Sequence, residues 1–348
     1  MRIVTFGETM LRLKSPGFER LLQTPRLEAI FGGSESNVAV SLAQFGMDAS
    51  FVTVFPDNPL TDACIRELRG FGVHTDGIAR VPGRMGVYFV EAGACQRSGG
   101  VVYDRAGSAI AVADPETIDW GSALEGADWL HVSGITPALS ETAAEMTLLG
   151  MKKARERNAT VSLDLNLRMN LWKYGKTPRE VIPELVRLAD ICIASDEHIS
   201  IALGIETPDG PQTSGAPDPA PYRALAKKVT IEFPNLRMLA TTLRESVSAD
   251  HNNLSACLYT APNGGKSAEF HISRQYAIRD IVDRIGGGDA FDAGLIYGLA
   301  HYGDPRRALE FAVAAGCLKH SIPGDVNRVS AAEVESLAFG SGDGRIRR

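Results

Sequence analysis

The sequence predicts an α/β protein with a doubly wound, mostly parallel central sheet and helices on both faces. Short, almost continuously apolar segments of strand length alternate along the chain with segments whose apolar residues recur at helical spacing. This alternation is typical of parallel sheets built from β–α–β units. The 348 residues, 44% of them hydrophobic, are enough to bury a large core.

The elements follow in order from these patterns. The chain opens with a strand-like segment at residues 3–6. Further buried strands are predicted at residues 51–54, 129–132, 160–163 and 191–193, and helices at residues 59–71, 141–157 and 178–188. Ligands of such sheets lie at the carboxyl ends of the strands, where Asn166 and Arg168 are expected.

Composition narrows the class of protein. The net charge of -6 gives no basic surface for nucleic acid or an anionic membrane. No apolar run approaches a membrane span, and the opening strand leaves no room for a signal peptide. Five scattered cysteines without a Cys-x-x-Cys pair indicate reduced thiols in a cytoplasmic protein.

The most informative segment is residues 283–291, in which Gly286, Gly287 and Gly288 run directly into Asp289. The apolar series that follows has the spacing of a buried helix, so a helix should begin at the glycines. Its first N–H groups have no intrahelical partner and lie at the positive end of the helix dipole, which suits a phosphate. The Asp289 carboxylate is well placed to accept a proton from a hydroxyl brought to that cradle. Taken alone, the string fits a glycine-rich turn with Asp289 as a cap equally well.

A second glycine-rich element lies near the start of the chain. Gly32 and Gly33 precede a predicted helix that should stop at Gly46. Polar side chains crowd its first turn, including Ser34 and Asn37. Such residues can cap the helix or hydrogen-bond sugar hydroxyls.

Together the two elements resemble the two signatures of the ribokinase-like (PfkB) carbohydrate kinases. Gly32-Gly33 with Asn37-Val38-Ala39 is similar to the N-terminal signature, and Gly286 to Asp289 is similar to the C-terminal Gly-x-Gly-Asp. The likeness runs from Met1 to about Val329. It implies a single ribokinase-like α/β domain over residues 1–348, with a small β lid contributed by residues 12–27 and 86–105.

Within the family, the central region is most similar to the 2-keto-3-deoxygluconate kinases, through residues 85–89, 102–109, 131–139 and 162–168. The resemblance implies transfer of a phosphoryl group from ATP to the O6 hydroxyl of that sugar acid, with Asp289 as base and the three glycines as anion hole. The residues implied to bind the substrate are Gly33, Ser34, Asn37, Tyr88, Tyr103, Arg105 and Arg168. Arginines suit an acid because a guanidinium makes bidentate hydrogen bonds with a carboxylate. Outside the family context, ordinary salt bridges explain both arginines.

The resemblance also implies ATP and Mg²⁺ as cofactors. The residues expected to contact ATP are Asn166, Arg168, Ser195, Thr241, Arg244, Gly286 and Gly288. Two family patterns are altered here: residues 239–246 lack a Lys-x-Gly turn, and Asn-x-x-Glu is replaced by Ser195-Asp196-Glu197-His198. We name no protein ligand for Mg²⁺, which needs few when it bridges phosphates.

Further expectations concern loops and partners. Residues 206–222, rich in Pro, Gly and Ser, predict a surface loop or insertion. The lid strands have edges that can pair between subunits, which makes a homo-oligomer an option.

Other functions stay open from the sequence. A PfkB-family kinase for fructose, another keto-deoxy sugar or a ribosyl compound would share the base and the anion hole, and the stereochemistry of a sugar acid is undetermined. A sugar or nucleotide sensor without turnover belongs to a different class, but it has no need of a base beside an anion hole. A dinucleotide oxidoreductase is disfavoured, since Gly7-Glu8-Thr9-Met10 replaces Gly-x-Gly-x-x-Gly after the first strand.

Overall fold

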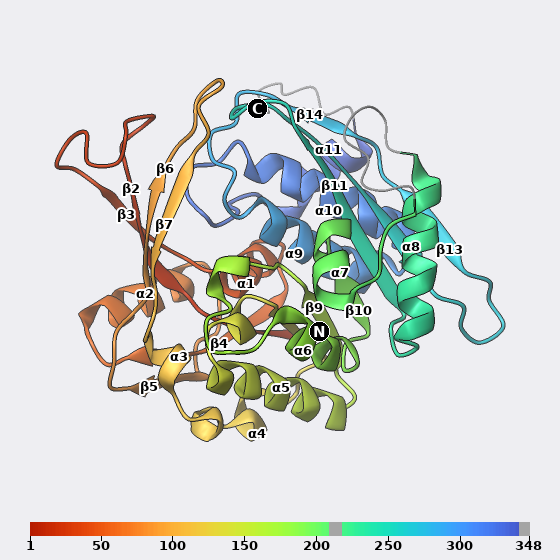
Figure 1. Ribbon diagram of the computed structural model, residues 1–348, viewed down its shortest axis with the longest axis horizontal. Coiled ribbons are helices and arrows are strands. Elements are labelled where there is room, and N and C mark those ends of the chain that lie inside the picture. The colour runs from red at the N-terminus through yellow and green to blue at the C-terminus, as the bar shows by residue number, and fades with distance from the viewer. Residues whose placement is uncertain (209–217, 341–348) are drawn as a thin grey trace.

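A computed structural model describes residues 1–208 and 218–340 of the chain (Figure 1). Its centre is a ten-stranded sheet in the order β13-β12-β11-β10-β9-β8-β1-β4-β5, with β14 paired to β12. The pairs from β5 to β11 are parallel, and β12 joins β11, β13 and β14 in antiparallel pairs. These strands are β1 (Arg2–Phe6), β4 (Asp48–Pro56), β5 (Ile78–Val81), β8 (Trp129–Ser133), β9 (Thr160–Asp164), β10 (Ile191–Ile193), β11 (Met238–Ser246), β12 (Asn252–Thr260), β13 (Glu269–Ile272) and β14 (Tyr276–Ile278).

Helices cover both faces of this sheet, which confirms the predicted fold class. Neighbouring residues of β1 show the two sides: Ile3 packs with residues of α1, α9, α10 and α11, whereas Val4 packs with residues of α5, α6, α7 and α8. In Figure 1 the blue helices and the green helices lie on opposite sides of the strands. The helices are α1 (Ser34–Gln44), α2 (Pro59–Gly70), α3 (Ala109–Val112), α4 (Trp120–Ala123), α5 (Glu141–Glu156), α6 (Pro178–Val186), α7 (Asp196–Leu203), α8 (Pro219–Glu232), α9 (Gly287–Tyr302), α10 (Pro305–Lys319) and α11 (Ala331–Phe339).

The strands predicted for the central sheet and the helices predicted between them in the first two hundred residues are present at their expected places, with ends shifted by a few residues. The helix expected at the glycines is α9, whose N-cap is Gly286, and the helix expected after Gly33 is α1. Gly46 follows α1 in the left-handed backbone region with φ +86°, as a stop residue should. No helix of the described residues is long and apolar enough to cross a membrane.

A second sheet of four strands, in the order β3-β2-β6-β7, projects from one side of the molecule (Figure 1). It is formed by β2 (Met10–Lys14), β3 (Glu28–Gly32), β6 (Val87–Glu91) and β7 (Gly100–Asp104). The first predicted lid segment was misplaced: residues 15–27 contain no strand, and β3 starts after them. Prolines at positions 16 and 25 disfavour a ladder there, and the Leu21 N–H is bonded to Glu91 instead. Pairing of lid edges between subunits stays a prediction.

The loop predicted at residues 206–222 is too long at its C-terminal end. Residues 209–217 of that stretch lie outside the described residues. Helix α8 already begins at Pro219, because the Asp218 side chain accepts a hydrogen bond from the Ala220 N–H and proline suits the first helical turn.

Candidate active site

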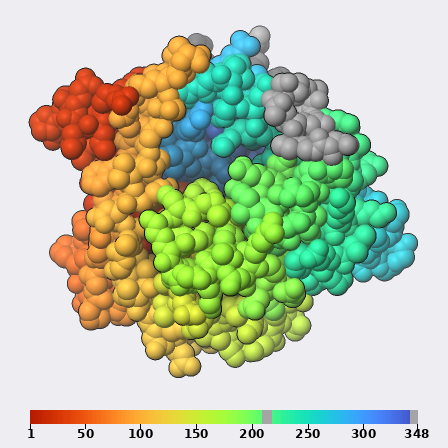
Figure 2. All heavy atoms as spheres, in the orientation of Figure 1, coloured from red at the N-terminus to blue at the C-terminus, as the bar shows by residue number. Residues whose placement is uncertain are grey.

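A cavity of about 1070 Å³ opens between the four-stranded sheet β3-β2-β6-β7, here called the lid sheet, the carboxyl ends of the central strands and the N-terminus of α9. Figure 2 shows the surface hollowed at this place, between the orange lid and the green and teal segments. The cavity is lined by fourteen of the predicted site residues: Gly33, Ser34, Asn37, Tyr88, Tyr103, Arg105, Asn166, Arg168, Ser195, Arg244, Gly286, Gly287, Gly288 and Asp289.

The glycine turn at the start of α9 has the form of an anion cradle. Gly286 adopts a left-handed backbone with φ +82°, and a β-carbon there would collide with the Asp325 carbonyl oxygen. Gly288 faces open space, with no heavy atom within 4 Å of where a β-carbon would lie. The first N–H groups of α9 lack intrahelical partners and carry the positive end of its dipole. These features fit a phosphate group.

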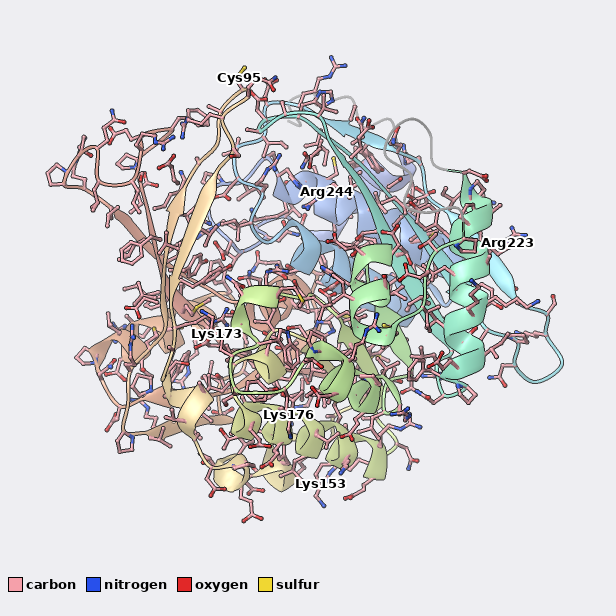
Figure 3. The ribbon with its side chains drawn as sticks, viewed as in Figure 1. Cys95, Lys153, Lys173, Lys176, Arg223 and Arg244 are labelled. Carbon is pink, nitrogen blue, oxygen red and sulfur yellow. The ribbon has the colours of Figure 1, made fainter. Side chains whose placement is uncertain are left out.

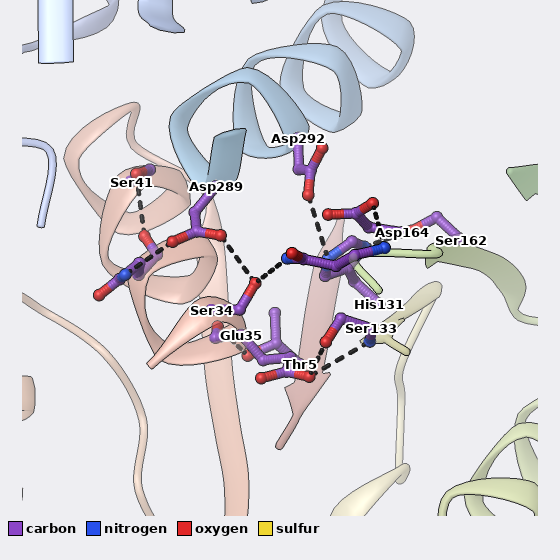
Figure 4. Close-up of polar contacts among 12 residues, drawn as sticks. Thr5, Ser34, Glu35, Ser41, His131, Ser133, Ser162, Asp164, Asp289 and Asp292 are labelled. Carbon is purple, nitrogen blue, oxygen red and sulfur yellow. Dashed lines mark hydrogen bonds and ion pairs between the residues drawn. The ribbon is translucent and has the colours of Figure 1, made fainter. Parts of the chain in front are cut away.

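Asp289 lies in the first turn of α9 and is held by two donors from the start of α1. The Ser34 hydroxyl donates to its Oδ1 and the Asn37 amide to its Oδ2, both at 2.7 Å, while the Asn166 amide donates to the Ser34 hydroxyl at 3.1 Å (Figure 4). Burial raises the pKa of Asp289, against the opposing effect of these two hydrogen bonds. The carboxylate is therefore oriented at the cradle and more basic than an exposed one.

A pH dependence follows from this environment. A base works only when ionised, so turnover should fall on acidification, with a midpoint above the 3.8 of an unperturbed aspartic acid. The dependence of kcat on pH at saturating substrates measures this limb. If Asp289→Asn shows the same acidic limb in its residual rate, the limb belongs to another group.

The polar residues in the first turn of α1 point in two directions, some toward the cavity and some toward the protein core. Gly33 is the N-cap of the helix, and a β-carbon there would meet the backbone oxygen of Glu8 in the segment between β1 and β2. Glu35 points away from the cavity and accepts hydrogen bonds from the Ser133 hydroxyl at 2.6 Å and the Ser133 N–H at 3.2 Å. Burial raises the pKa of Glu35 to about 7. Only Ser34 and Asn37 thus face Asp289, so the helix start positions the carboxylate.

The two arginines predicted to hold an acid differ in their surroundings. Arg105 is buried and paired with Glu8, whose Oε2 accepts from its Nε at 2.7 Å. Arg168 donates to the carbonyl oxygens of Asn166 and Leu167, at 3.4 and 2.9 Å. Among the described residues it has no carboxylate within ion-pair distance. Arg168 is thus the guanidinium with spare capacity for an anion.

The predicted tyrosines stack in the lid wall of the cavity. The rings of Tyr88 and Tyr103 lie 5.9 Å apart, and the Arg105 guanidinium lies 5.5 Å from the Tyr103 ring centre. The Tyr88 hydroxyl donates to the Asp325 carboxylate. Its ring, more than its hydroxyl, is therefore what Tyr88 offers to a ligand.

A group of buried carboxylates beside Asp289 was missed by the sequence interpretation. Asp164 ends β9 and Asp292 lies one turn after Asp289, and both line the cavity. Burial and the charge of Asp164 raise the pKa of Asp292 well above its usual range. His131 lies 3.9 Å from Asp292, and burial lowers its pKa to about 3, so it is neutral (Figure 4). A sequence signal existed only for Asp164, which stands in the quoted segment 162–168.

On the nucleotide side, the stretch expected to replace a Lys-x-Gly turn is strand β11. Thr241 is buried in it and does not line the cavity, whereas Thr242 and Arg244 do. Arg244 lies on this strand (Figure 3), and its side chain lines the cavity. Desolvation and the charges of Arg284 and Arg168 lower the pKa of Arg244. The guanidinium groups of Arg244 and Arg284, which both line the cavity, suit polyphosphate.

The residues that replace Asn-x-x-Glu form the first turn of helix α7 and its N-cap. Ser195 caps α7 by accepting from the His198 N–H at 3.2 Å. Burial and the nearby arginines lower the pKa of His198 to about 4, so it is neutral. The described residues contain no cluster of three or more His, Cys, Asp or Glu residues that could hold a metal.

The glycine turn allows a matched pair of variants. Gly288→Ala places a methyl group in open space at the cradle, so phosphoryl transfer should fall about tenfold, equal to about 1.4 kcal/mol, while thermal stability is kept. Gly287→Ala directs the methyl group at the His320 ring, 2.6 Å away, and should lower the melting temperature. Initial rates and thermal melts separate these effects. An unchanged rate in Gly288→Ala would argue against phosphate binding at this turn.

The comparison with known families decides the class. The family described as pfkB family carbohydrate kinase matches residues 1–331. The chain belongs to this family. The resemblance drawn from the two glycine signatures is thereby confirmed, and the protein is a carbohydrate kinase.

Three relatives indicate where the chain stands within the pfkB family. The 2-dehydro-3-deoxygalactonokinase of Haloferax volcanii is 32% identical over 346 residues, which cover 99% of both chains. The crystal structure of 2-dehydro-3-deoxygluconokinase from Thermotoga maritima is 44% identical with a TM-score of 0.89, covering 98% of this chain and 100% of that one. The fructokinase of Klebsiella pneumoniae is 28% identical, with 91% of each chain covered.

Proposed function

We propose that this pfkB kinase transfers the γ-phosphoryl group of ATP to the O6 hydroxyl of 2-keto-3-deoxygluconate (2-dehydro-3-deoxygluconate), giving the 6-phosphate. The observation that carries the substrate class is Arg168, a guanidinium without a carboxylate partner among the described residues, in the cavity that also holds Asp289 and the glycine turn. A carboxylate substrate would complete its charge-assisted hydrogen bonds. The two relatives of highest identity reported above carry names of kinases for keto-deoxy sugar acids.

In the proposed reaction, Asp289 accepts the proton of the O6 hydroxyl as that oxygen attacks the γ-phosphorus in line. The bond between the γ-phosphorus and the leaving oxygen of ADP breaks, and the first N–H groups of α9 stabilise the negative charge on the transferring group. Preorganised donors of this kind contribute about 3 to 4 kcal/mol each in other enzymes. Bound Mg²⁺ would supply charge neutralisation of the phosphates.

The other residues of the proposed site orient the base, bind the substrates or exclude water. Ser34 and Asn37 hold the carboxylate of Asp289 toward the acceptor, and Arg168 fixes the acid end of the sugar. Arg244 faces the polyphosphate from β11. The lid covers the sugar and excludes water, which suppresses hydrolysis of ATP.

A second candidate, a kinase for a neutral keto sugar such as fructose, is favoured by the pairing of Arg105 with Glu8. Of the two arginines that the sugar-acid hypothesis names, that ion pair leaves Arg168 alone without a carboxylate partner among the described residues. A binding protein without turnover is not favoured, because Asp289 is oriented by two hydrogen bonds beside the cradle.

The test measures ADP release with 2-keto-3-deoxygluconate and its galactonate epimer, followed by phosphorus NMR of the product. We expect turnover with at least one epimer and coupling of the phosphorus to the two protons of a terminal CH₂ group. Coupling to a single proton would refute transfer to O6. Failure to release ADP with either acid would refute the substrate class.

A further inference from the structure

The lid sheet and the glycine turn are joined by one buried guanidinium. Arg12 lies on the lid strand β2, and its side chain is 0% exposed. It is among the largest fully buried side chains of the described residues. Its guanidinium forks between Asp283, at 2.5 Å, and Asp325. Both carboxylates come from loops of the main body, so Arg12 connects the lid with residues far along the chain.

Asp283 links this guanidinium to the glycine turn. It stands three residues before Gly286, and its Oδ1 accepts a hydrogen bond from the Ile285 N–H at 3.1 Å. Its Oδ2 also accepts from the Gly324 N–H at 3.2 Å. The carboxylate that Arg12 binds therefore also fixes the backbone that enters the turn.

Asp325 links the guanidinium to the turn by a second route. Its carbonyl oxygen packs against Gly286 so closely that a β-carbon there would collide with it. Its carboxylate accepts a hydrogen bond from Tyr88 on the lid strand β6 and lies against Gly32 at the end of β3. Three of the four lid strands thus contact Asp325, whose carbonyl oxygen packs against the glycine turn.

The negative charges of Asp283 and Asp325 are paired with the Arg12 guanidinium only when the lid is in place. Asp283 and Asp325 are 7% and 3% exposed. Lys319, also buried, donates to the carbonyl oxygens of Asp283 and Ile322 at 3.4 and 3.1 Å, but no carboxylate lies within ion-pair distance of it in the described residues. Withdrawing Arg12 would leave two buried carboxylates without their direct partner, which is strongly unfavourable. Water would then have to enter behind the glycine turn.

We propose that Arg12 is a positioning residue, through which closure of the lid orders the anion cradle at residues 283–288. The inference rests on the proposed function of that cradle in phosphoryl transfer. When the lid is open, Arg12 is withdrawn and the turn loses the carboxylates that define it. When the lid closes over an acceptor, the guanidinium returns to Asp283 and Asp325. These two residues then hold the first N–H groups of α9 in the position that binds the phosphate. Transfer is thereby confined to the closed state with an acceptor present.

The test combines kinetics with hydrogen exchange. Arg12→Lys keeps the charge but loses the fork, and Tyr88→Phe removes only the hydroxyl that holds Asp325. With the best acceptor of the wild type, Arg12→Lys should lower kcat roughly 100-fold, as a small misplacement of a reacting group can. The KM of the acceptor should change far less, and amide exchange in the peptide covering residues 283–289 should accelerate. Tyr88→Phe should act in the same direction with a smaller effect.

Two controls distinguish positioning from general destabilisation. Lys14→Met removes a charge from the same lid strand, where Lys14 pairs with Glu28 at 3.7 Å, and should leave kcat and the exchange of residues 283–289 unchanged. In Arg12→Ala, millimolar guanidinium should restore part of kcat, which a purely structural defect would not show. A wild-type kcat, or wild-type exchange at residues 283–289, in Arg12→Lys would overturn the proposal. Should the wild type phosphorylate no acceptor, the proposed function fails, and the exchange comparison still decides the role of Arg12.

Discussion

Replacement of Asp289 by Asn should reduce kcat by a factor on the order of 100 or more, because a positioned proton acceptor contributes at least that much to a transfer of this kind. The amide is nearly isosteric, but it cannot accept the proton of the hydroxyl. The amide oxygen of the introduced side chain can still accept from the Asn37 amide, and its NH₂ group can donate to the Ser34 hydroxyl oxygen, so its position should be kept. Steady-state rates with ATP and the sugar acid measure the loss.

Binding and folding must survive for that result to be informative. Calorimetry should show ATP and sugar acid bound by Asp289→Asn within a few-fold of the wild type. Asp304→Asn is a matched control, since Asp304 only caps α10 and Asn caps a helix equally well. A near-wild-type kcat in Asp289→Asn would remove Asp289 as the base.

Replacement of Arg168 by Ala should raise the KM of the sugar acid roughly 10-fold to 150-fold, the cost of about 1.5 to 3 kcal/mol for a lost hydrogen bond to an ionised group. The KM of ATP should change little, and so should the melting temperature, because Arg168 bonds only to nearby backbone carbonyl oxygens among the described residues. A neutral sugar should be affected far less, since it never made the contact.

Arg105→Ala provides the contrast within the same cavity. It leaves Glu8 buried without its partner, so the protein should lose thermal stability as well as affinity. Thermal melts and KM values of both variants are to be compared. If Arg168→Ala penalised acid and neutral sugars equally, Arg168 would have no role in reading the carboxylate.

Most of the fold was predictable because its signals are local. Apolar strands of the parallel sheet and the helices between them can be recognised from spacing, and Gly46 marks a helix end through its backbone freedom. The lid was located less well. Strand β3 runs into the Gly32-Gly33 signature, so a sequence pattern assigned to a ligand loop also belongs to a strand.

Fourteen of the predicted site residues line one cavity, but the contacts that they make within the protein could not be predicted from the sequence. Ser34 and Asn37 were expected at a sugar, and they also donate hydrogen bonds to Asp289; their contact with a sugar stays a prediction. Arg105 was expected to hold the acid end of the substrate or to form an ordinary salt bridge, and the structure shows it paired with Glu8, 97 positions away. Arg12 and Asp325 are 313 positions apart. Such pairings depend on how the lid docks on the main sheet, and no local pattern encodes that arrangement.

The most direct test of the sugar-acid assignment is the ratio of kcat/KM for 2-keto-3-deoxygluconate to that for fructose, measured by ADP release from the wild-type protein. The account predicts that the acid is preferred by roughly tenfold or more, the value of one charge-assisted hydrogen bond to Arg168. Equal values, or a preference for fructose, would contradict it and make the neutral-sugar kinase the better description.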